Sequence, residues 1–222
     1  MIKKTLIWDL PTRLFHWSLV LLVSFSIYTG LTGGVAEMEY HMLSGYCILV
    51  LLLFRLGWGF LGSYHSRFIN FVSVRGLTSY VGNILNRGGE TKGHNPLGAW
   101  SVIAMLTVIL VQAITGLFSD DDIMTKGPLT HLVPDNFVNE LTGLHRLNSW
   151  LVYGLIGLHL IAIAFYEIYR RERLIVPMIT GRKQVLNERE ENGAHTEKYS
   201  AIRASLLILA CTGIVYYLVN EA

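Results

Sequence analysis

Four histidines lie inside, or at the very edge of, long apolar stretches of this 222-residue chain: His16, His41, His145 and His159. An ionisable side chain at membrane depth is costly and usually faces a functional interior. His145 and His159 occupy one apolar segment, and their spacing at about 100° per residue sends both rings from the same helix face. They are separated by about 21 Å along the helix axis. This pattern indicates ligands for two cofactors stacked across a bilayer.

The composition indicates a membrane protein. Hydrophobic residues make up 52% of the chain and charged residues only 15%, against about 25% charged residues in a typical soluble domain. The two cysteines, Cys47 and Cys211, fall in apolar segments, and the sequence contains neither a CxxCH haem-attachment motif nor a CxxC pair. We therefore expect no covalently attached haem, no cysteine-based zinc or redox site and no nucleic-acid partner.

Five apolar segments are long enough to cross a membrane, given about 20 residues per span. They cover residues 14–31, 41–61, 97–118, 144–166 and 204–219. The predicted fold class is an all-α membrane protein: a four-helix transmembrane bundle with a fifth, C-terminal transmembrane helix. We expect residues 1–184 to form the cofactor-binding domain, 185–203 a charged cytoplasmic linker and 204–222 the fifth helix.

The basic residues predict the orientation of the spans. The chain has 18 lysines and arginines, and only Lys126 and Arg146 fall on one side of the predicted membrane. The other 16 fall on the opposite side. This count assigns Arg55 to the connection after the second span. Because cytoplasmic loops carry the excess of lysine and arginine, the N-terminus is expected in the cytoplasm and the C-terminus in the periplasm. We expect a multi-pass protein of the bacterial inner membrane, surrounded by membrane lipid.

This orientation sorts the four histidines by depth. His16 and His159 are expected near the cytoplasmic face, and His41 and His145 near the periplasmic face. Two imidazoles from facing helices suit a haem iron, whose axial positions lie on opposite sides of the macrocycle. With both axial positions filled by protein, such an iron has no open site for oxygen and exchanges electrons. We predict two non-covalent haem b groups, held by His16 with His159 and by His41 with His145.

The same residues have other interpretations. A single histidine at a span end is more often interfacial, but four in depth-matched pairs reverse that preference. A di-iron or zinc enzyme needs carboxylates or clustered histidines inside the spans, and Glu167 is the only plausible acid. Arg13 and Arg146 are candidate partners for haem propionates, although simple topological charges are an equally good explanation for each.

Several sequence runs together form a recognisable pattern. They are Trp8-Asp9-Leu10-Pro11-Thr12-Arg13-Leu14-Phe15-His16-Trp17, His41 with Gly45, Gly93-His94-Asn95-Pro96-Leu97-Gly98, the His145 and His159 pair, and Met178-Ile179-Thr180-Gly181-Arg182-Lys183. These runs resemble the bacterial cytochrome b561 and nickel–iron hydrogenase b-type cytochrome group. The resemblance covers residues 6–184 and implies a four-helix haem b core with bis-histidine pairs, which passes electrons between membrane quinone and a partner redox protein. The fifth span lies outside this four-span minimum.

Two functions follow as hypotheses. The first is a dihaem membrane cytochrome b that relays electrons in a respiratory chain between the quinone pool and a periplasmic redox protein, such as a c-type cytochrome. The alternative is the membrane-anchoring b-type cytochrome subunit of a hydrogenase-like complex, with no independent reaction. A haem-free transporter is a weaker third reading. Because the outside is positive, the field favours outward electron movement, and inward movement needs a compensating potential drop.

Overall fold

The computed structural model describes residues 2–72, 96–123, 125–186 and 197–221. Five of its helices are long and apolar enough to cross a membrane, so the predicted all-α membrane fold is confirmed. Each of them overlaps one predicted span. They are α1 (Leu10–Thr32), α2 (Val35–Leu61), α5 (Pro96–Leu117), α6 (Asp135–Ala164), which continues as the π-helical segment η3 (Phe165–Tyr169), and α8 (Glu197–Asn220).

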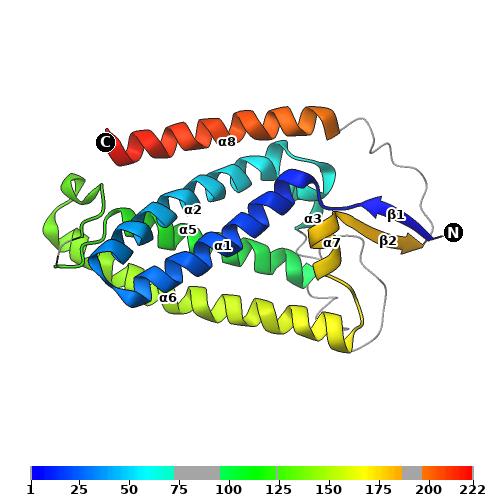
Figure 1. The fold of residues 1–222 in the computed structure, drawn as a ribbon, viewed down its shortest axis with the longest axis horizontal. Coiled ribbons are helices and arrows are strands. Elements are labelled where there is room, and N and C mark those ends of the chain that lie inside the picture. Colours follow the sequence, from blue (N-terminus) through cyan, green and yellow to red (C-terminus); the bar gives the residue numbers. More distant parts are fainter. Residues whose placement is uncertain (1, 73–95, 124, 187–196, 222) are drawn as a thin grey trace.

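Short elements lie at the ends of the bundle. Strand β1 pairs antiparallel with β2, with Ile2 opposite Leu186 and Leu6 opposite Arg182. This ribbon was not predicted; it extends beyond the bundle at the end where the chain begins (Figure 1). The short elements are β1 (Ile2–Leu6), η1 (Tyr64–Ser66), α3 (Phe68–Phe71), η2 (Thr130–Leu132), α7 (Ile175–Thr180) and β2 (Arg182–Leu186).

The first transmembrane helix has strong start and stop signals. Asp9 is extended at the N-cap, and its carboxylate accepts a 2.9 Å hydrogen bond from the backbone N–H of Thr12. Pro11 lies in the first turn, where its missing N–H costs nothing. Gly33 ends the helix with a φ of 68°, a left-handed conformation that glycine adopts without steric cost. These signals fix where α1 begins, and therefore the depth of His16.

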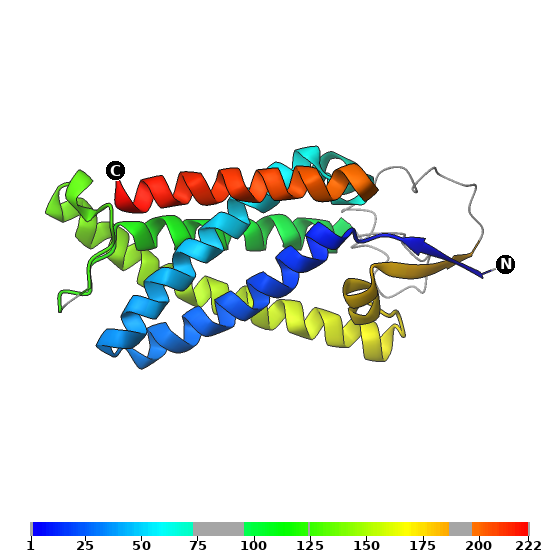
Figure 2. The ribbon, with the colours of Figure 1, turned by 45° about the horizontal axis from the view of Figure 1, so that its top comes forward.

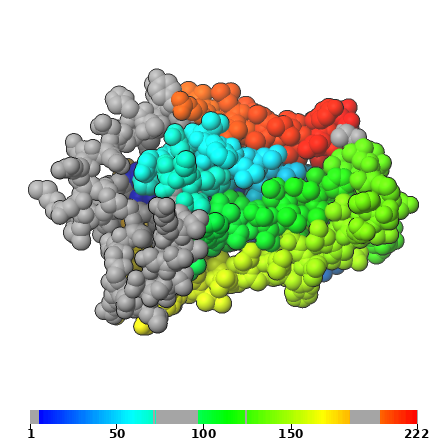
Figure 3. All heavy atoms as spheres, turned by 180° about the vertical axis from the view of Figure 1, so that it is seen from behind, coloured from blue at the N-terminus to red at the C-terminus, as the bar shows by residue number. Residues whose placement is uncertain are grey.

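The helices pack as two hairpins. Close contacts join α1 to α2 and α5 to α6, α2 also meets α5, and α8 lies along α2. Figures 1 and 2 show α8 on the opposite side of the bundle from α6, and Figure 3 shows α5 running between α2 and α6 on the far face. Among the described residues, α6 has no comparably close packing against α1 or α2. This looser seam is where the candidate site lies.

A buried polar network fixes the beginning of α1 to the end of α2. The Asp9 carboxylate accepts hydrogen bonds from Trp58 Nε1 at 3.1 Å and from the Ser66 hydroxyl at 3.0 Å. Arg55, which the charge count placed in a connection, lies instead inside α2 and is only 3% exposed, with its guanidinium 4.6 Å from the centre of the Phe68 ring. These contacts place a buried acid and a buried base at the same end of the bundle.

The pKa of Asp9 reflects this network. Burial alone would raise the pKa, but hydrogen bonds from Thr12, Ser63 and Ser66 together hold the pKa of Asp9 below its ordinary value of 3.8. The carboxylate is therefore ionised at neutral pH. Because the folded-state pKa is lowered, its contribution to stability is present above about pH 4 and is lost as the pH falls through the lowered value.

Replacing Asp9 should weaken the folded chain. Asp9→Asn removes one acceptor oxygen and the negative charge near Arg55, so we expect a loss of roughly 1–3 kcal/mol in the free energy of unfolding. The midpoint of thermal unfolding in detergent at pH 7 measures this loss. Glu39→Gln is the matched control, because Glu39 is exposed on α2. An equal midpoint for both variants would contradict the prediction.

Candidate functional site

Two of the predicted histidines face each other across the looser seam. His41 on α2 and His145 on α6 have ring centroids 6.2 Å apart and perpendicular ring planes. Two metal–imidazole bonds of about 2 Å each, with the ring half-widths, span about 6 Å. The spacing between these rings is therefore suitable for one metal ion between them.

Hydrogen bonds fix the tautomer of both rings in this pair. His41 Nδ1 lies 2.8 Å from the carbonyl oxygen of Ser26 on α1, and His145 Nδ1 lies 3.0 Å from the carbonyl oxygen of Gln112 on α5. A carbonyl can only accept, so each Nδ1 carries the proton and donates it. Each neutral ring then has its lone pair on Nε2, which is the usual arrangement of a metal-binding histidine.

A cavity of about 500 Å³ adjoins this pair and is lined by both histidines. Glycines border it. A Cβ on Gly45 would meet no atom within 4 Å, whereas a Cβ on Gly30 would lie 2.9 Å from His41 Nδ1 and one on Gly116 would lie 3.0 Å from His145 Cε1. Gly30 and Gly116 therefore give the two rings the space that their orientation requires, and Gly45 leaves open space in the cavity wall.

Two polar residues that sequence reasoning missed complete this site. Gln112 Nε2 donates to His145 Nε2 at 3.1 Å, and Asn148 Nδ2 donates to Gln112 Oε1 at 2.7 Å and to the Val108 carbonyl at 3.0 Å. The sequence did carry a signal for both residues, because a polar amide side chain inside an apolar span is unusual, as a histidine is. Because Gln112 occupies the lone pair of His145, binding of a metal by that nitrogen requires the amide to move.

The other predicted pair, His16 on α1 and His159 on α6, also comes together. The two rings are close enough to interact electrostatically, and the Trp17 ring packs edge-on against His16 with centroids 5.1 Å apart. In the described part of the chain, the buried His16 Nδ1 has no hydrogen-bond partner. The structure thus brings together the same two pairs that the depth argument predicts, while ligation itself stays a prediction.

The two candidate propionate partners differ in their surroundings. Arg13 donates from Nη1 to the Ile179 carbonyl at 2.6 Å, and its buried Nε has no partner among the described residues. Arg146 is exposed and lines the cavity beside His145. Arg146 is therefore free to meet an anionic group at that end, whereas one nitrogen of Arg13 already holds α7 against α1.

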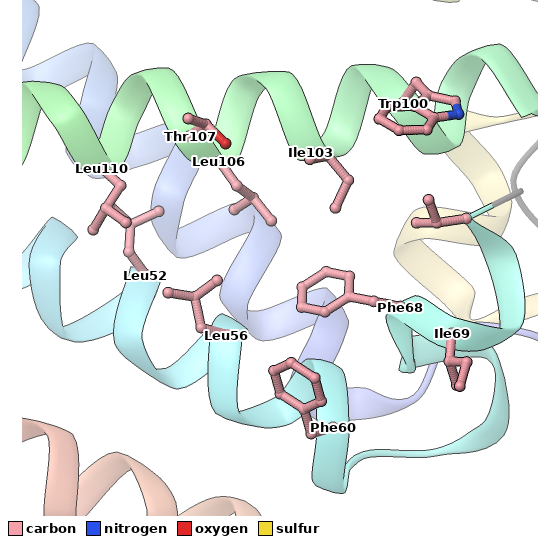
Figure 4. A pocket seen from close by; sticks show the side chains of 11 residues that line it. Leu52, Leu56, Phe60, Phe68, Ile69, Trp100, Ile103, Leu106, Thr107 and Leu110 are labelled. Atoms are coloured by element: carbon pink, nitrogen blue, oxygen red, sulfur yellow. The ribbon is translucent and has the colours of Figure 1, made fainter. Parts of the chain in front are cut away.

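A second cavity, of about 510 Å³, lies between α2, α3 and α5 and has a different character. Its wall is apolar and contains Leu52 and Leu56 of α2, Phe68 of α3 and Leu106 of α5 (Figure 4). None of its lining residues is a histidine or carries a charge. The described residues of this cavity can surround an apolar molecule, and none of them is a ligand for iron.

Comparison with known proteins identifies the family. Residues 7–181, which are the larger part of the chain, match the model of the prokaryotic cytochrome b561 family. The chain belongs to the prokaryotic cytochrome b561 family. It is therefore a multi-pass bacterial membrane protein of the electron-transport class, and the predicted family resemblance is confirmed. The match ends before α8, as does the resemblance inferred from the sequence runs.

Curated relatives give the same picture. The chain is 24% identical to a probable Ni/Fe-hydrogenase B-type cytochrome subunit of Rhizobium leguminosarum bv. viciae, over 85% of this chain and 92% of the relative. It is 22% identical to a subunit of Escherichia coli K12 described in the same terms, over 79% and 88% of the two chains. A Bradyrhizobium diazoefficiens relative is 26% identical over 80% and 85%. No solved structure matches the chain significantly.

A b-type cytochrome implies haem b, and the residues present fit that group. In the His41–His145 pair, both Nδ1 atoms are protonated and glycines leave room beside the rings. In the His16–His159 pair, the Nδ1 of His16 is buried and has no partner among the described residues. Across the described ranges there is no cluster of three or more histidine, cysteine, aspartate or glutamate residues that could hold a separate metal ion. Residues 93–95 of the Gly93–Gly98 run lie outside the described residues.

The glycines beside the rings supply a test. Gly30→Ala and Gly116→Ala each place a methyl group about 3 Å from a ring atom of His41 or His145, so the ring must turn. We expect haem affinity at this pair to fall by roughly 10- to 100-fold, the usual effect of disturbing the residues around a metal ligand. Haem retention after dilution in detergent, followed by absorbance, measures the change.

Gly154→Ala is the matched control for both variants. A Cβ at Gly154 on α6 would meet no atom within 4 Å, so haem retention should be unchanged. Retention that falls equally in all three variants would show that the effect comes from glycine substitution in general, and would contradict the specific role of Gly30 and Gly116.

Proposed function

We propose that this chain is the electron-transferring membrane subunit of a redox complex and holds two haem b groups. One lies between His41 and His145, and the other between His16 and His159. The observation that carries the proposal is the pairing itself: α6 contributes one histidine to each pair, and its partners come from α2 and α1 at a seam where the helices are not tightly packed.

Haem b supplies one-electron chemistry when it is bound, and the chain's residues determine where and how it is held. The Ser26 and Gln112 carbonyls orient His41 and His145 through their Nδ1 protons, so that Nε2 is the nitrogen that would bind iron, at His145 once the Gln112 amide has moved. Arg146, which is exposed and lines the cavity, would pair with a propionate there. With imidazoles from two helices as its ligands, a bound haem b would exchange electrons rather than bind oxygen.

The partner is best proposed from the relatives. The curated relatives cited above are named as B-type cytochrome subunits of a nickel–iron hydrogenase. This favours the alternative function derived from the sequence, a membrane-anchor subunit, over an independent relay to a c-type cytochrome. We propose a hydrogenase-like enzyme as the redox partner, membrane quinone as the second substrate, and the charge-based orientation with the N-terminus in the cytoplasm.

Haem stoichiometry tests the two sites. We expect two haems per chain by pyridine haemochrome assay against protein concentration. His16→Leu and His159→Leu should each remove the same spectral component, and His41→Leu and His145→Leu the other. His131→Leu, at an exposed histidine in the connection between α5 and α6, is the matched control. One haem per chain, or a component shared by His16 and His41, would overturn the assignment.

Complex formation tests the partner. An affinity-tagged chain, expressed at native level in its host and purified in mild detergent, should bring down a large metalloenzyme subunit and show haem reduction by hydrogen. A chain that purifies alone, is reduced by quinol and passes electrons to cytochrome c would instead support the independent relay. The double variant His41→Leu/His145→Leu separates docking from electron transfer, since the partner should still bind while haem reduction by hydrogen is lost.

A further inference from the structure

The two histidine pairs differ in their hydrogen bonding. Both rings of the His41–His145 pair donate an Nδ1 proton to a backbone carbonyl, at 2.8 and 3.0 Å. In the other pair, His16 Nδ1 is buried without an acceptor, and no hydrogen bond to His159 is present within the described ranges. The same kind of ligand therefore stands in two different surroundings.

The neighbouring side chains are also more polar at the His41–His145 pair than at the His16–His159 pair. Hydroxyl groups lie near the first pair: Ser26 Oγ is 3.2 Å from His41 Nδ1, and Thr115 Oγ1 is 3.2 Å from His145 Nδ1. Around His159, every residue within one helical turn is apolar, from Leu155 to Ile163. One pair thus lies in a polar pocket, and the other has an apolar helix surface on its α6 side.

The nearby arginines do not distinguish the two pairs. Arg146 directly follows His145 and lines the cavity of the His41–His145 pair. Arg13 lies one turn before His16, and its side chain donates to the neutral Ile179 carbonyl. Each pair therefore has one arginine within a helical turn, so the contrast between the pairs lies in hydrogen bonding and polarity.

We propose that these features give the haem at the His41–His145 pair a lower reduction potential than the haem at the His16–His159 pair. A hydrogen bond from Nδ1 to a carbonyl makes the imidazole a more basic ligand, which stabilises the more positive ferric iron. An apolar site disfavours the extra positive charge and stabilises the ferrous form. This inference rests on the proposed function, since it requires a haem at each pair.

The proposed order of reduction potentials determines which direction of electron transfer is favoured. In the proposed orientation, the low-potential pair faces the periplasm and the high-potential pair faces the cytoplasm. An order of this sign favours net electron movement from a reductant on the periplasmic side, such as a hydrogen-oxidising enzyme, towards quinone near the cytoplasmic side. It supplies the compensating drop that inward movement against the membrane field requires.

A redox titration of the purified protein tests the order. We expect two resolved waves, followed by the haem absorbance as the potential is changed. Replacing one ligand by methionine raises the potential of that centre while keeping an axial ligand. His41→Met and His145→Met should each move the lower wave upward, and His16→Met and His159→Met should each move the upper wave further upward. If His16→Met moves the lower wave, the proposed order is wrong.

If the methionine variants do not bind haem, leucine variants that keep a single haem allow the two potentials to be measured separately. His159→Leu should leave a single haem at the His41–His145 pair, and His145→Leu a single haem at the His16–His159 pair. The first protein should titrate at the lower potential, and equal or reversed potentials would overturn the inference. Loss of both haems in either variant, or one haem in the wild type, would contradict the proposed function instead. His131→Leu should leave both waves unchanged.

Discussion

The arrangement of this protein depends on one constraint: an imidazole placed at membrane depth needs a hydrogen-bond partner or a metal. His41 meets this need by donating to the Ser26 carbonyl, and His145 by donating to the Gln112 carbonyl. The first bond lies within the α1–α2 hairpin and the second within the α5–α6 hairpin. Each hairpin therefore fixes its own ring, and the lone pair of each ring is on Nε2, where that of His145 accepts from the Gln112 amide.

The same constraint explains why the hairpins are not packed against each other everywhere. If α6 packed closely on α1 and α2, no space would remain between the His41 and His145 rings for a ligand. Instead, α2 and α5 carry the contact between hairpins, with Leu52 and Ile109 in the buried core, and α6 stands off from α1 and α2. The space beside the rings is thus part of the fold and is bordered by Gly30, Gly45 and Gly116.

The sequence carries the spans and the depth of each histidine, because both depend on residue type and spacing. Apolar length predicts five helices, and the spacing of His145 and His159 predicts two depths on α6. The acceptors of the Nδ1 protons could not be predicted, because a backbone carbonyl exists at every residue and only packing selects Ser26 and Gln112. The β1–β2 ribbon was missed for a similar reason, since strand pairing depends on where α1 and α7 bring the two segments.

Helix α8 shows how the additional span can join the bundle without altering the sites. It packs along α2, where Leu207 lies against Gly57 and Cys211 is buried in the core, while the histidine pairs lie at the seam with α6. Moving one electron across the whole membrane involves about 2.3 kcal/mol per 100 mV, so the two sites must differ in redox potential if electrons are to move inward. Among the described residues, the carbonyl acceptors that distinguish the two pairs belong to Ser26 of α1 and Gln112 of α5, so this source of a difference does not involve α8.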